Sequence, residues 1–196
     1  MTVAFFDFDG TLVKGDSLKA FLFFYFRNNQ SKLLLRTSFF LPYFIAHKLG
    51  IVSNNQSKAK LFQLFFKGEK RELFLSRAKQ FSDEWIDKNL NTQVWNKLQW
   101  HKKKGHLVYV VSASIDTYLL PWINRNEIKL LCTEMDLSND PISGKWKTPN
   151  CYGQEKVNRI VEEINVDSFE ASYAYGDSKG DREMLELVDF GFYKSV

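Results

Sequence analysis

The chain has 196 residues, 44% of them hydrophobic and 26% charged, with a formal net charge of +4. These values indicate a globular protein with one sizeable core and an inserted subdomain, and they exclude a disordered chain and two full-sized domains. The two cysteines, Cys132 and Cys151, are expected to be reduced thiols, and no uncharged run approaches the roughly 18 residues that a membrane span needs.

The first predicted element is a short strand. Residues 3–6 form a continuous apolar run that ends at Asp7, which is typical of a buried strand in a parallel sheet. A long stretch of helical pattern follows, and no convincing strand interrupts it. We expect its helices at residues 17–29, 31–49, 56–67 and 70–90.

From about residue 91 the pattern alternates between helix and strand. The predicted helices cover residues 91–104, 115–126, 154–165 and 179–187, and the predicted strands cover residues 107–111, 130–134, 143–146, 171–175 and 190–193. Such alternation implies a parallel sheet with helices on both faces. We therefore predict an α/β core formed by residues 1–15 and 91–196, with a helical cap, residues 16–90, inserted after the first strand.

Polar residues follow three of the predicted strands. These residues are Asp7, Ser112 and Asp177. Each alone could be an ordinary turn residue, but the carboxyl ends of parallel strands share one rim of the sheet, so all three are expected to converge there. Two carboxylates are ligands that Mg²⁺ prefers, and Lys156, near the start of a helix, could offset their repulsion of a phosphate.

The same residues suggest a phosphoryl-transfer mechanism. A carboxylate such as Asp7 can attack phosphorus and form an acyl phosphate. Asp9, two residues later, could protonate the leaving alcohol and then activate water. Ser112 and the backbone N–H groups of Ala113 and Ser114 could donate hydrogen bonds to the phosphoryl oxygens.

Four segments, in this order along the chain, resemble the motifs of the haloacid dehalogenase superfamily. They are Asp7-Phe8-Asp9-Gly10-Thr11, Val111-Ser112-Ala113-Ser114, Gly153-Gln154-Glu155-Lys156 and Gly176-Asp177-Ser178-Lys179-Gly180-Asp181. The position of the cap is similar to that in the C1-capped subfamily IB, which includes phosphoserine phosphatases and phosphatidylglycerophosphate phosphatases. Two residues depart from the phosphoserine phosphatase pattern: Ala113 replaces its glycine and Gly180 its asparagine.

The resemblance implies a phosphatase with a Rossmann-like core and a role for each matching residue. Asp7 would be the nucleophile and Asp9 the general acid and base. Mg²⁺ would be held by Asp7, Asp177 and the backbone carbonyl of Asp9. Phosphate would be bound by Ser112, Ala113, Lys156 and Gly10, and Asp181 and Thr11 would support the site. Asp16 has the spacing of a residue that contacts the substrate's amino group, although we favour a helix cap for it.

The first part of the cap has an unusual composition. Residues 17–68 contain no Asp or Glu, eight Lys or Arg, and ten of the 18 Phe. The phenylalanines could fill a small helical bundle beneath a solvated basic face. Alternatively, the cap could contact an anionic membrane and present a lipid phosphate to the site.

The remaining expectations concern partners and location. The N-terminus runs into Asp7 and Asp9 at once, unlike a signal peptide, so we expect a cytoplasmic protein, with peripheral contact at the inner face of the membrane as an open alternative. The expected partner is a phosphorylated substrate. No nucleic-acid module is recognised, and the sequence does not give the oligomeric state. A soluble phosphatase for small metabolites and an inactive binding protein of the same fold are the alternatives.

Overall fold

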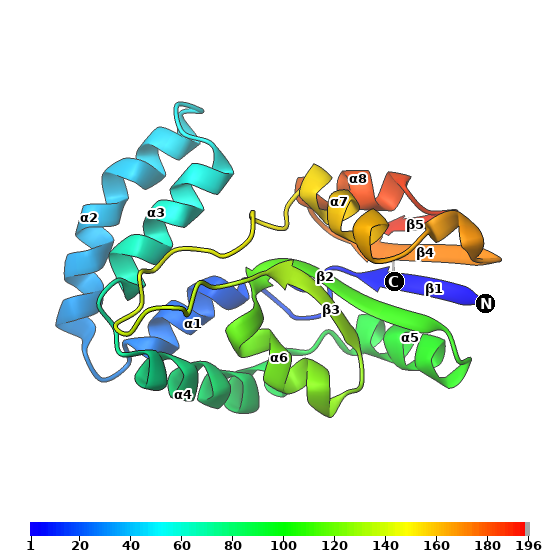
Figure 1. Ribbon diagram of the computed structural model, residues 1–196, viewed down its shortest axis with the longest axis horizontal. Coiled ribbons are helices and arrows are strands. Elements are labelled where there is room, and N and C mark those ends of the chain that lie inside the picture. Colours follow the sequence, from blue (N-terminus) through cyan, green and yellow to red (C-terminus); the bar gives the residue numbers. More distant parts are fainter. Residues whose placement is uncertain (195–196) are drawn as a thin grey trace.

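The computed structural model describes residues 1–194 and has a five-stranded parallel sheet at its centre (Figure 1). Its strands are β1 (Thr2–Phe6), β2 (Leu107–Ile115), β3 (Lys129–Thr133), β4 (Ala171–Gly176) and β5 (Phe190–Tyr193). Their order in the sheet is β3-β2-β1-β4-β5. The chain winds outward in both directions from β1, so the carboxyl end of β1 is the switch point where such sheets bind ligands. The predicted α/β class is confirmed.

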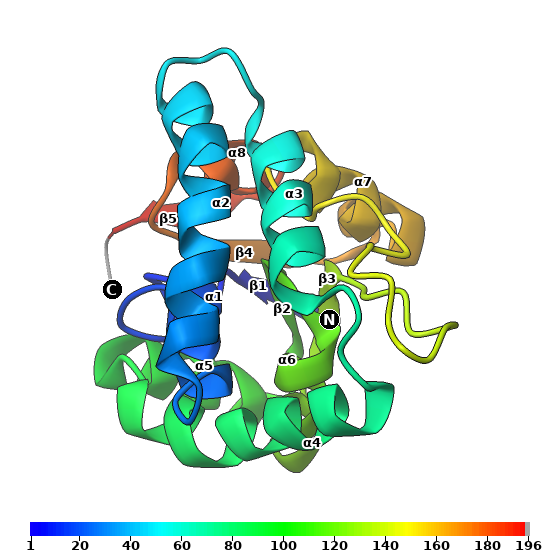
Figure 2. The same cartoon turned by 90° about the vertical axis from the view of Figure 1, so that its left-hand side faces the viewer.

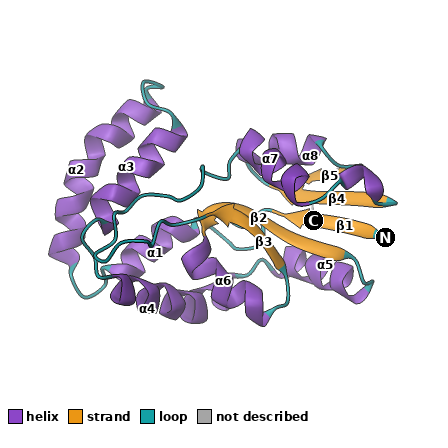
Figure 3. Cartoon of the chain, in the orientation of Figure 1, coloured by secondary structure: helices purple, strands orange, loops and turns teal. Residues whose placement is uncertain are grey.

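Helices cover both faces of the sheet, as Figure 3 shows. They are α5 (Thr92–Lys103), α6 (Asp116–Arg125), α7 (Gln154–Glu163) and α8 (Arg182–Glu186). Strand β1 is buried from Val3 to Phe6, and its side chains alternate between two hydrophobic clusters. Phe5 belongs to the cluster with Ile160 of α7, whereas Phe6 belongs to the larger cluster with Leu98 of α5.

Four α-helices lie between β1 and α5. They are α1 (Ser17–Tyr25), α2 (Gln30–Lys48), α3 (Asn54–Phe66) and α4 (Arg71–Phe81). The predicted single helix over residues 70–90 is wrong in its second half, where a π-helical turn (Ser82–Ile86) and a 3₁₀ turn (Asp87–Asn89) follow α4. Among residues 1–194, no helix is both long and apolar enough to cross a bilayer.

The cap helices differ in how they are packed. Phe21 of α1 contacts Tyr118 of α6 with ring centroids 5.1 Å apart, and Phe81 of α4 contacts the same tyrosine at 5.3 Å, so α1 and α4 share the core cluster. Helix α2 has no fully buried residue and packs against α3. Figure 2 shows this α2–α3 hairpin projecting from the rest of the molecule. The residue limits of core and cap stay a prediction.

The predicted strand over residues 143–146 is wrong. The segment between β3 and α7 carries only one isolated bridge, between Met135 and Trp146. Its backbone pairs with the cap instead of the sheet: Ile142 donates to the Glu69 carbonyl at 2.9 Å and accepts from Gly68 N–H at 3.0 Å. These bonds satisfy backbone groups that a sheet would otherwise satisfy. The segment thereby ties the cap to the core.

Candidate active site

The strand ends bring the predicted residues to one cavity of about 620 Å³. Asp7 follows β1, Asp177 follows β4, and Ser112 lies within β2, which runs past its predicted end to Ile115 through a register shift. Nine of the eleven residues proposed from the sequence line this cavity, namely Asp7, Asp9, Gly10, Asp16, Ser112, Ala113, Lys156, Asp177 and Asp181. The other two are Thr11, whose hydroxyl lies within hydrogen-bond distance of Asp7 and Asp177, and Ser114, whose N–H donates to Ser112 Oγ instead of pointing to a phosphate.

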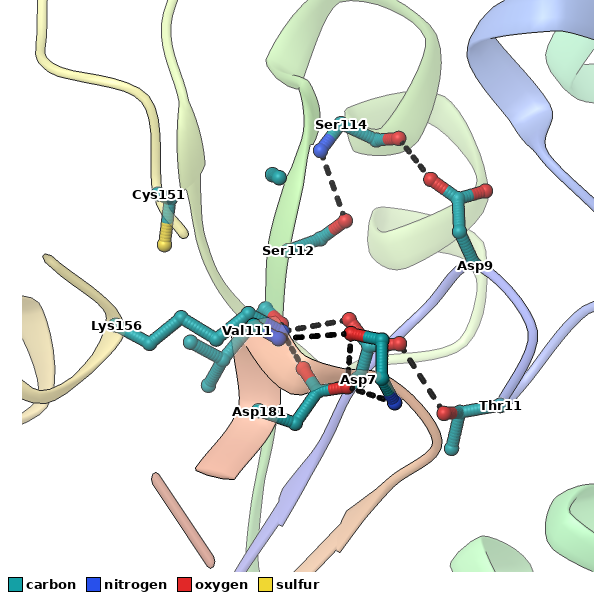
Figure 4. Close-up of polar contacts among 12 residues, drawn as sticks. Asp7, Asp9, Thr11, Val111, Ser112, Ser114, Cys151, Lys156 and Asp181 are labelled. Atoms are coloured by element: carbon teal, nitrogen blue, oxygen red, sulfur yellow. Dashed lines mark hydrogen bonds and ion pairs between the residues drawn. The ribbon is translucent and has the colours of Figure 1, made fainter. Parts of the chain in front are cut away.

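Lys156 is the buried cation of the site. It lies in the first turn of α7, and its Nζ is 2.6 Å from Asp7 Oδ1, 2.6 Å from Asp181 Oδ1 and 2.7 Å from the Val111 carbonyl (Figure 4). These three bonds use all three protons of the ammonium group. Burial alone would lower the pKa of Lys156, but the charges of Asp7 and Asp181 raise it above its ordinary value. Lys156 therefore stays charged.

Three carboxylates lie close together beside Lys156. Asp7, Asp177 and Asp181 each offer an oxygen within 4.8 Å of the others. Burial raises the pKa of Asp7 to about 7 in spite of Lys156, and burial followed by the Asp181 charge raises the pKa of Asp177. One ammonium group does not balance this charge, so the oxygen donors fit a hard divalent cation such as Mg²⁺.

The loop after β1 holds two of these carboxylates close together. Thr11 Oγ1 lies 3.1 Å from Asp7 Oδ2 and 3.3 Å from Asp177 Oδ1, so its single hydroxyl proton is shared between the two carboxylates. Gly10 has a φ of +79°, and a Cβ there would lie 2.8 Å from Asp177 Oδ1 and closer still to Oδ2. Only glycine fits without moving Asp177.

The Asp9 carboxylate points away from the three-carboxylate cluster, as Figure 4 shows. Asp9 Oδ1 accepts from the Ser17 N–H at 2.7 Å, and Oδ2 accepts from the Ser114 hydroxyl. Burial raises the pKa of Asp9, although the hydrogen bonds from Ser114 and Ser17 oppose the rise. The side chain thus holds a proton to higher pH than an exposed aspartate does.

The opposite wall of the cavity is formed by β2. Ser112 is 1% exposed, and its Oγ accepts from the Ser114 N–H at 3.0 Å, so its own proton is free to be donated toward the cavity. The Ala113 carbonyl accepts from Thr133 Oγ1 at 3.0 Å. The phosphate-binding roles of Ser112, Ala113, Lys156 and Gly10 stay predictions.

Asp16 caps α1 and also lines the cavity. Its Oδ1 accepts from the Lys19 N–H at 2.9 Å.

The departure at Gly180 has a steric explanation. A Cβ there would lie 2.7 Å from Cζ of Tyr152 and closer to two other ring carbons. The tyrosine ring, itself part of the cavity wall, therefore leaves no room for the asparagine of the phosphoserine phosphatase pattern.

Lys58 is the residue that sequence reasoning missed. It comes from α3, lines the cavity, and donates to the Ala113 carbonyl at 2.6 Å and to Asn150 Oδ1 at 3.3 Å. Burial lowers its pKa, and the charges of Asp9 and Asp16 oppose that shift. Residues 17–68 contain eight Lys or Arg, and nothing in the sequence distinguishes Lys58 from the other seven.

Comparisons with known proteins identify the family and several relatives of this chain. The model of the haloacid dehalogenase-like hydrolase family matches residues 4–186. Protein CicA of Caulobacter vibrioides is 31% identical over 193 residues, which is 96% of this chain and 84% of CicA.

Among solved structures, a protein of unknown function from Bordetella pertussis Tohama I has a TM-score of 0.79 at 20% identity, over 95% of this chain and 86% of that one. A phosphoserine phosphohydrolase-like protein from Francisella tularensis has a TM-score of 0.63 at 19% identity, over 95% and 83%. These two share the fold. Because the family model covers nearly the whole chain, and its motifs meet at one rim of the sheet, this chain belongs to the haloacid dehalogenase-like hydrolase family.

Proposed function

We propose that this hydrolase is a Mg²⁺-dependent phosphatase that passes through a covalent phosphoryl-Asp7 intermediate. The observation that supports it most is the setting of Asp7. This carboxylate is 6% exposed, lies at the switch point of the sheet, and is held on Oδ1 by Lys156 and on Oδ2 by Thr11. A carboxylate fixed in this way at the floor of a cavity is oriented for attack.

The proposed reaction has two steps. An Asp7 oxygen attacks phosphorus, the ester P–O bond breaks, and Asp9 gives its proton to the leaving alkoxide. Asp9 then takes a proton from water, the water oxygen attacks phosphorus, and the bond to Asp7 breaks to release inorganic phosphate. Ser112 donates to the phosphoryl oxygens throughout, and Lys156 contributes positive charge.

The metal would neutralise charge on the phosphoryl oxygens. Asp7, Asp177 and the Asp9 backbone carbonyl would hold Mg²⁺, with Asp181 in support. Asp181 also anchors Lys156, so it couples the metal to the cation of the site.

We further propose an anionic substrate, with a lipid phosphate favoured over a soluble metabolite. The cap supports this preference because Phe23 of α1 and Phe39 and Phe44 of α2 are exposed, although five of the ten phenylalanines in residues 17–68 are buried. The phosphoserine type is favoured by the position of Asp16 in the cavity wall, but that side chain is already engaged as the cap of α1. The complete set of acidic residues argues against an inactive protein.

Membrane contact would be made by the tip of the α2–α3 hairpin, which we define as Ile45, Lys48, Leu49, Ile51 and Lys60. Leu49 and Ile51 are 69% and 74% exposed. Three of the eight basic residues of residues 17–68 are paired with acids from outside that stretch: Arg27 with Glu84, and Lys32 and Arg36 with Glu69. The bases of the tip are not among them: Lys48 Nζ lies 5.4 Å from the Phe44 ring centroid and Lys60 Nζ 5.0 Å from that of Tyr43. Their charges are not neutralised by these rings and would attract anionic headgroups at a cytoplasmic membrane face.

Vesicle co-sedimentation tests the membrane contact. The protein should pellet with vesicles of anionic phosphatidylglycerol at low salt, and less with neutral phosphatidylcholine. Leu49→Asp combined with Ile51→Asp should abolish pelleting, whereas Leu73→Asp, on exposed α4 surface, should not. Absence of binding to anionic vesicles at low salt would refute the contact.

Hydrolysis of p-nitrophenyl phosphate tests the enzymatic proposal. Turnover should require Mg²⁺ and stop with EDTA. Asp7→Asn should reduce kcat by at least ~10⁴-fold with an unchanged circular dichroism spectrum, because the amide is a poor nucleophile. Turnover that is indifferent to EDTA, or an active Asp7→Asn enzyme, would contradict the mechanism.

A further inference from the structure

An apolar groove lies on the cap beside the active-site cavity. Helices α1, α2 and α3 form it, and it encloses about 380 Å³. Nine of its twelve lining residues are leucine or phenylalanine, and the others are Asp16, Lys19 and Thr37. A volume of this size is in the range of small-molecule sites, and its walls have few groups that could bind a polar ligand.

The groove and the active-site cavity are adjacent. They share five lining residues, Asp16, Leu18, Phe40, Phe44 and Leu61. A single molecule could therefore occupy both spaces, with one end at Asp7 and the other between the cap helices. Its polar end would meet carboxylates, Lys156 and Ser112, and its other end would meet hydrocarbon.

The walls of the groove are neither core nor ordinary surface. Leu22 of α1 and Leu33 and Phe40 of α2 are half-buried, and Phe65 of α3 is buried. The Phe40 ring lies 6.4 Å from that of Phe65 and 6.3 Å from that of Phe44. A contiguous apolar trough in contact with water is costly, and such features usually mark a binding site.

We propose that this groove binds a hydrocarbon chain of the substrate whose phosphate reacts at Asp7. The inference rests on the proposed phosphatase function and narrows its substrate class to phosphomonoesters that carry an alkyl or acyl chain. The five residues shared with the catalytic cavity favour this occupant over a segment of another protein. Asp16 and Lys19 are the charged residues among the twelve that line the groove, so most of its wall suits hydrocarbon better than a second anionic group.

The experiment uses soluble alkyl phosphates and the full-length protein. The ratio kcat/KM is measured for butyl, hexyl and octyl phosphate below their micellar concentrations, with p-nitrophenyl phosphate as the reference. Burial of one methylene is worth up to about fourfold, or ~0.8 kcal/mol, so we expect kcat/KM to rise at least roughly tenfold from butyl to octyl phosphate. The rise should appear mainly in KM.

A matched pair of variants tests whether the dependence of kcat/KM on chain length arises in the groove. Thr37 lines the groove and its neighbour Ser38 does not, and both are exposed on α2. Thr37→Trp should fill the groove and flatten the dependence on chain length, while p-nitrophenyl phosphate turnover stays unchanged. Ser38→Trp should leave both properties as in the wild type.

Two results would overturn the inference while leaving the phosphatase intact. One is equal kcat/KM for all chain lengths, and the other is an unchanged chain-length dependence in folded Thr37→Trp. If neither the alkyl phosphates nor p-nitrophenyl phosphate is hydrolysed, the proposed function itself fails. If size-exclusion chromatography shows a dimer that Thr37→Trp dissociates, a second copy of the chain occupies the groove and the inference is wrong.

Discussion

At the scale of single residues, the site depends on close approaches that only glycine permits. Gly10 and Gly15 provide a natural comparison, because both have a positive φ, +79° and +90°. A Cβ at Gly10 would collide with the Asp177 carboxylate, whereas a Cβ at Gly15 would meet nothing within 4 Å. The conformational cost of alanine is therefore common to both positions, and the collision with Asp177 is unique to Gly10.

We predict that Gly15→Ala loses about 1–2 kcal/mol of stability from the left-handed backbone, and that Gly10→Ala loses at least as much because its Cβ also displaces Asp177. Gly10→Ala should in addition raise the Mg²⁺ concentration for half-maximal activity at least ~10-fold, because a displacement of Asp177 by a fraction of an ångström spoils the ligand geometry. Metal titrations of activity and urea unfolding of both variants check this. Equal metal requirements in the two variants would show that Asp177 does not hold the metal.

At the scale of elements, one buried acid joins helix α2 to the rest of the cap, in addition to the packing of α2 against α3. Glu69, between α3 and α4, is 7% exposed and binds Lys32 Nζ at 2.6 Å, Arg36 Nη2 at 2.9 Å and the Tyr25 hydroxyl at 3.1 Å. Burial would raise the pKa of Glu69, but the hydrogen bond and charge of Lys32, with Arg36, hold it below its ordinary value. The ionised Glu69 carboxylate therefore stabilises the folded protein above the unfolded-state pKa of Glu69. This stabilisation is lost as the pH falls through the lower, folded-state pKa.

Glu69→Gln should therefore destabilise the protein by about 1–2 kcal/mol at neutral pH, mainly by loosening α2. Hydrogen exchange of α2 amides should accelerate while that of β1 and β4 amides is unchanged. The control is Glu84→Gln, which removes an exposed pair with Arg27 and should cost under ~1 kcal/mol. Equal effects of the two substitutions would mean that Glu69 does not anchor the helix.

Two predicted strands show which elements of the fold could be recognised from the sequence. Residues 3–6 were recognisable as a strand because a buried parallel strand is apolar on both faces, and the structure buries all four. Residues 143–146 were predicted as a strand, but they form only the isolated Met135–Trp146 bridge, beside which the Asp136 N–H donates to the Lys145 carbonyl at 3.0 Å. Their neighbour Ile142 bonds to Gly68 and Glu69 of the cap, and a local pattern carries no information about that long-range pairing.

At the scale of the whole molecule, the positions that could be predicted are those fixed by topology. Asp7, Ser112 and Asp177 belong to neighbouring strands of one parallel sheet, so their convergence follows from the strand direction alone. Lys58 and the groove could not be predicted, since they depend on how the cap helices are placed over the sheet, which helical periodicity does not specify.

The most direct test of the account is to trap the covalent intermediate. The enzyme is mixed with Mg²⁺ and substrate, quenched during turnover, and treated with borohydride, which reduces an acyl phosphate to the alcohol; peptide mass spectrometry then locates the change. We predict reduction at Asp7 alone, dependent on both substrate and Mg²⁺. Turnover without reduction at Asp7, or a phosphoryl group on another residue such as Ser112, would contradict the proposal that Asp7 is the nucleophile.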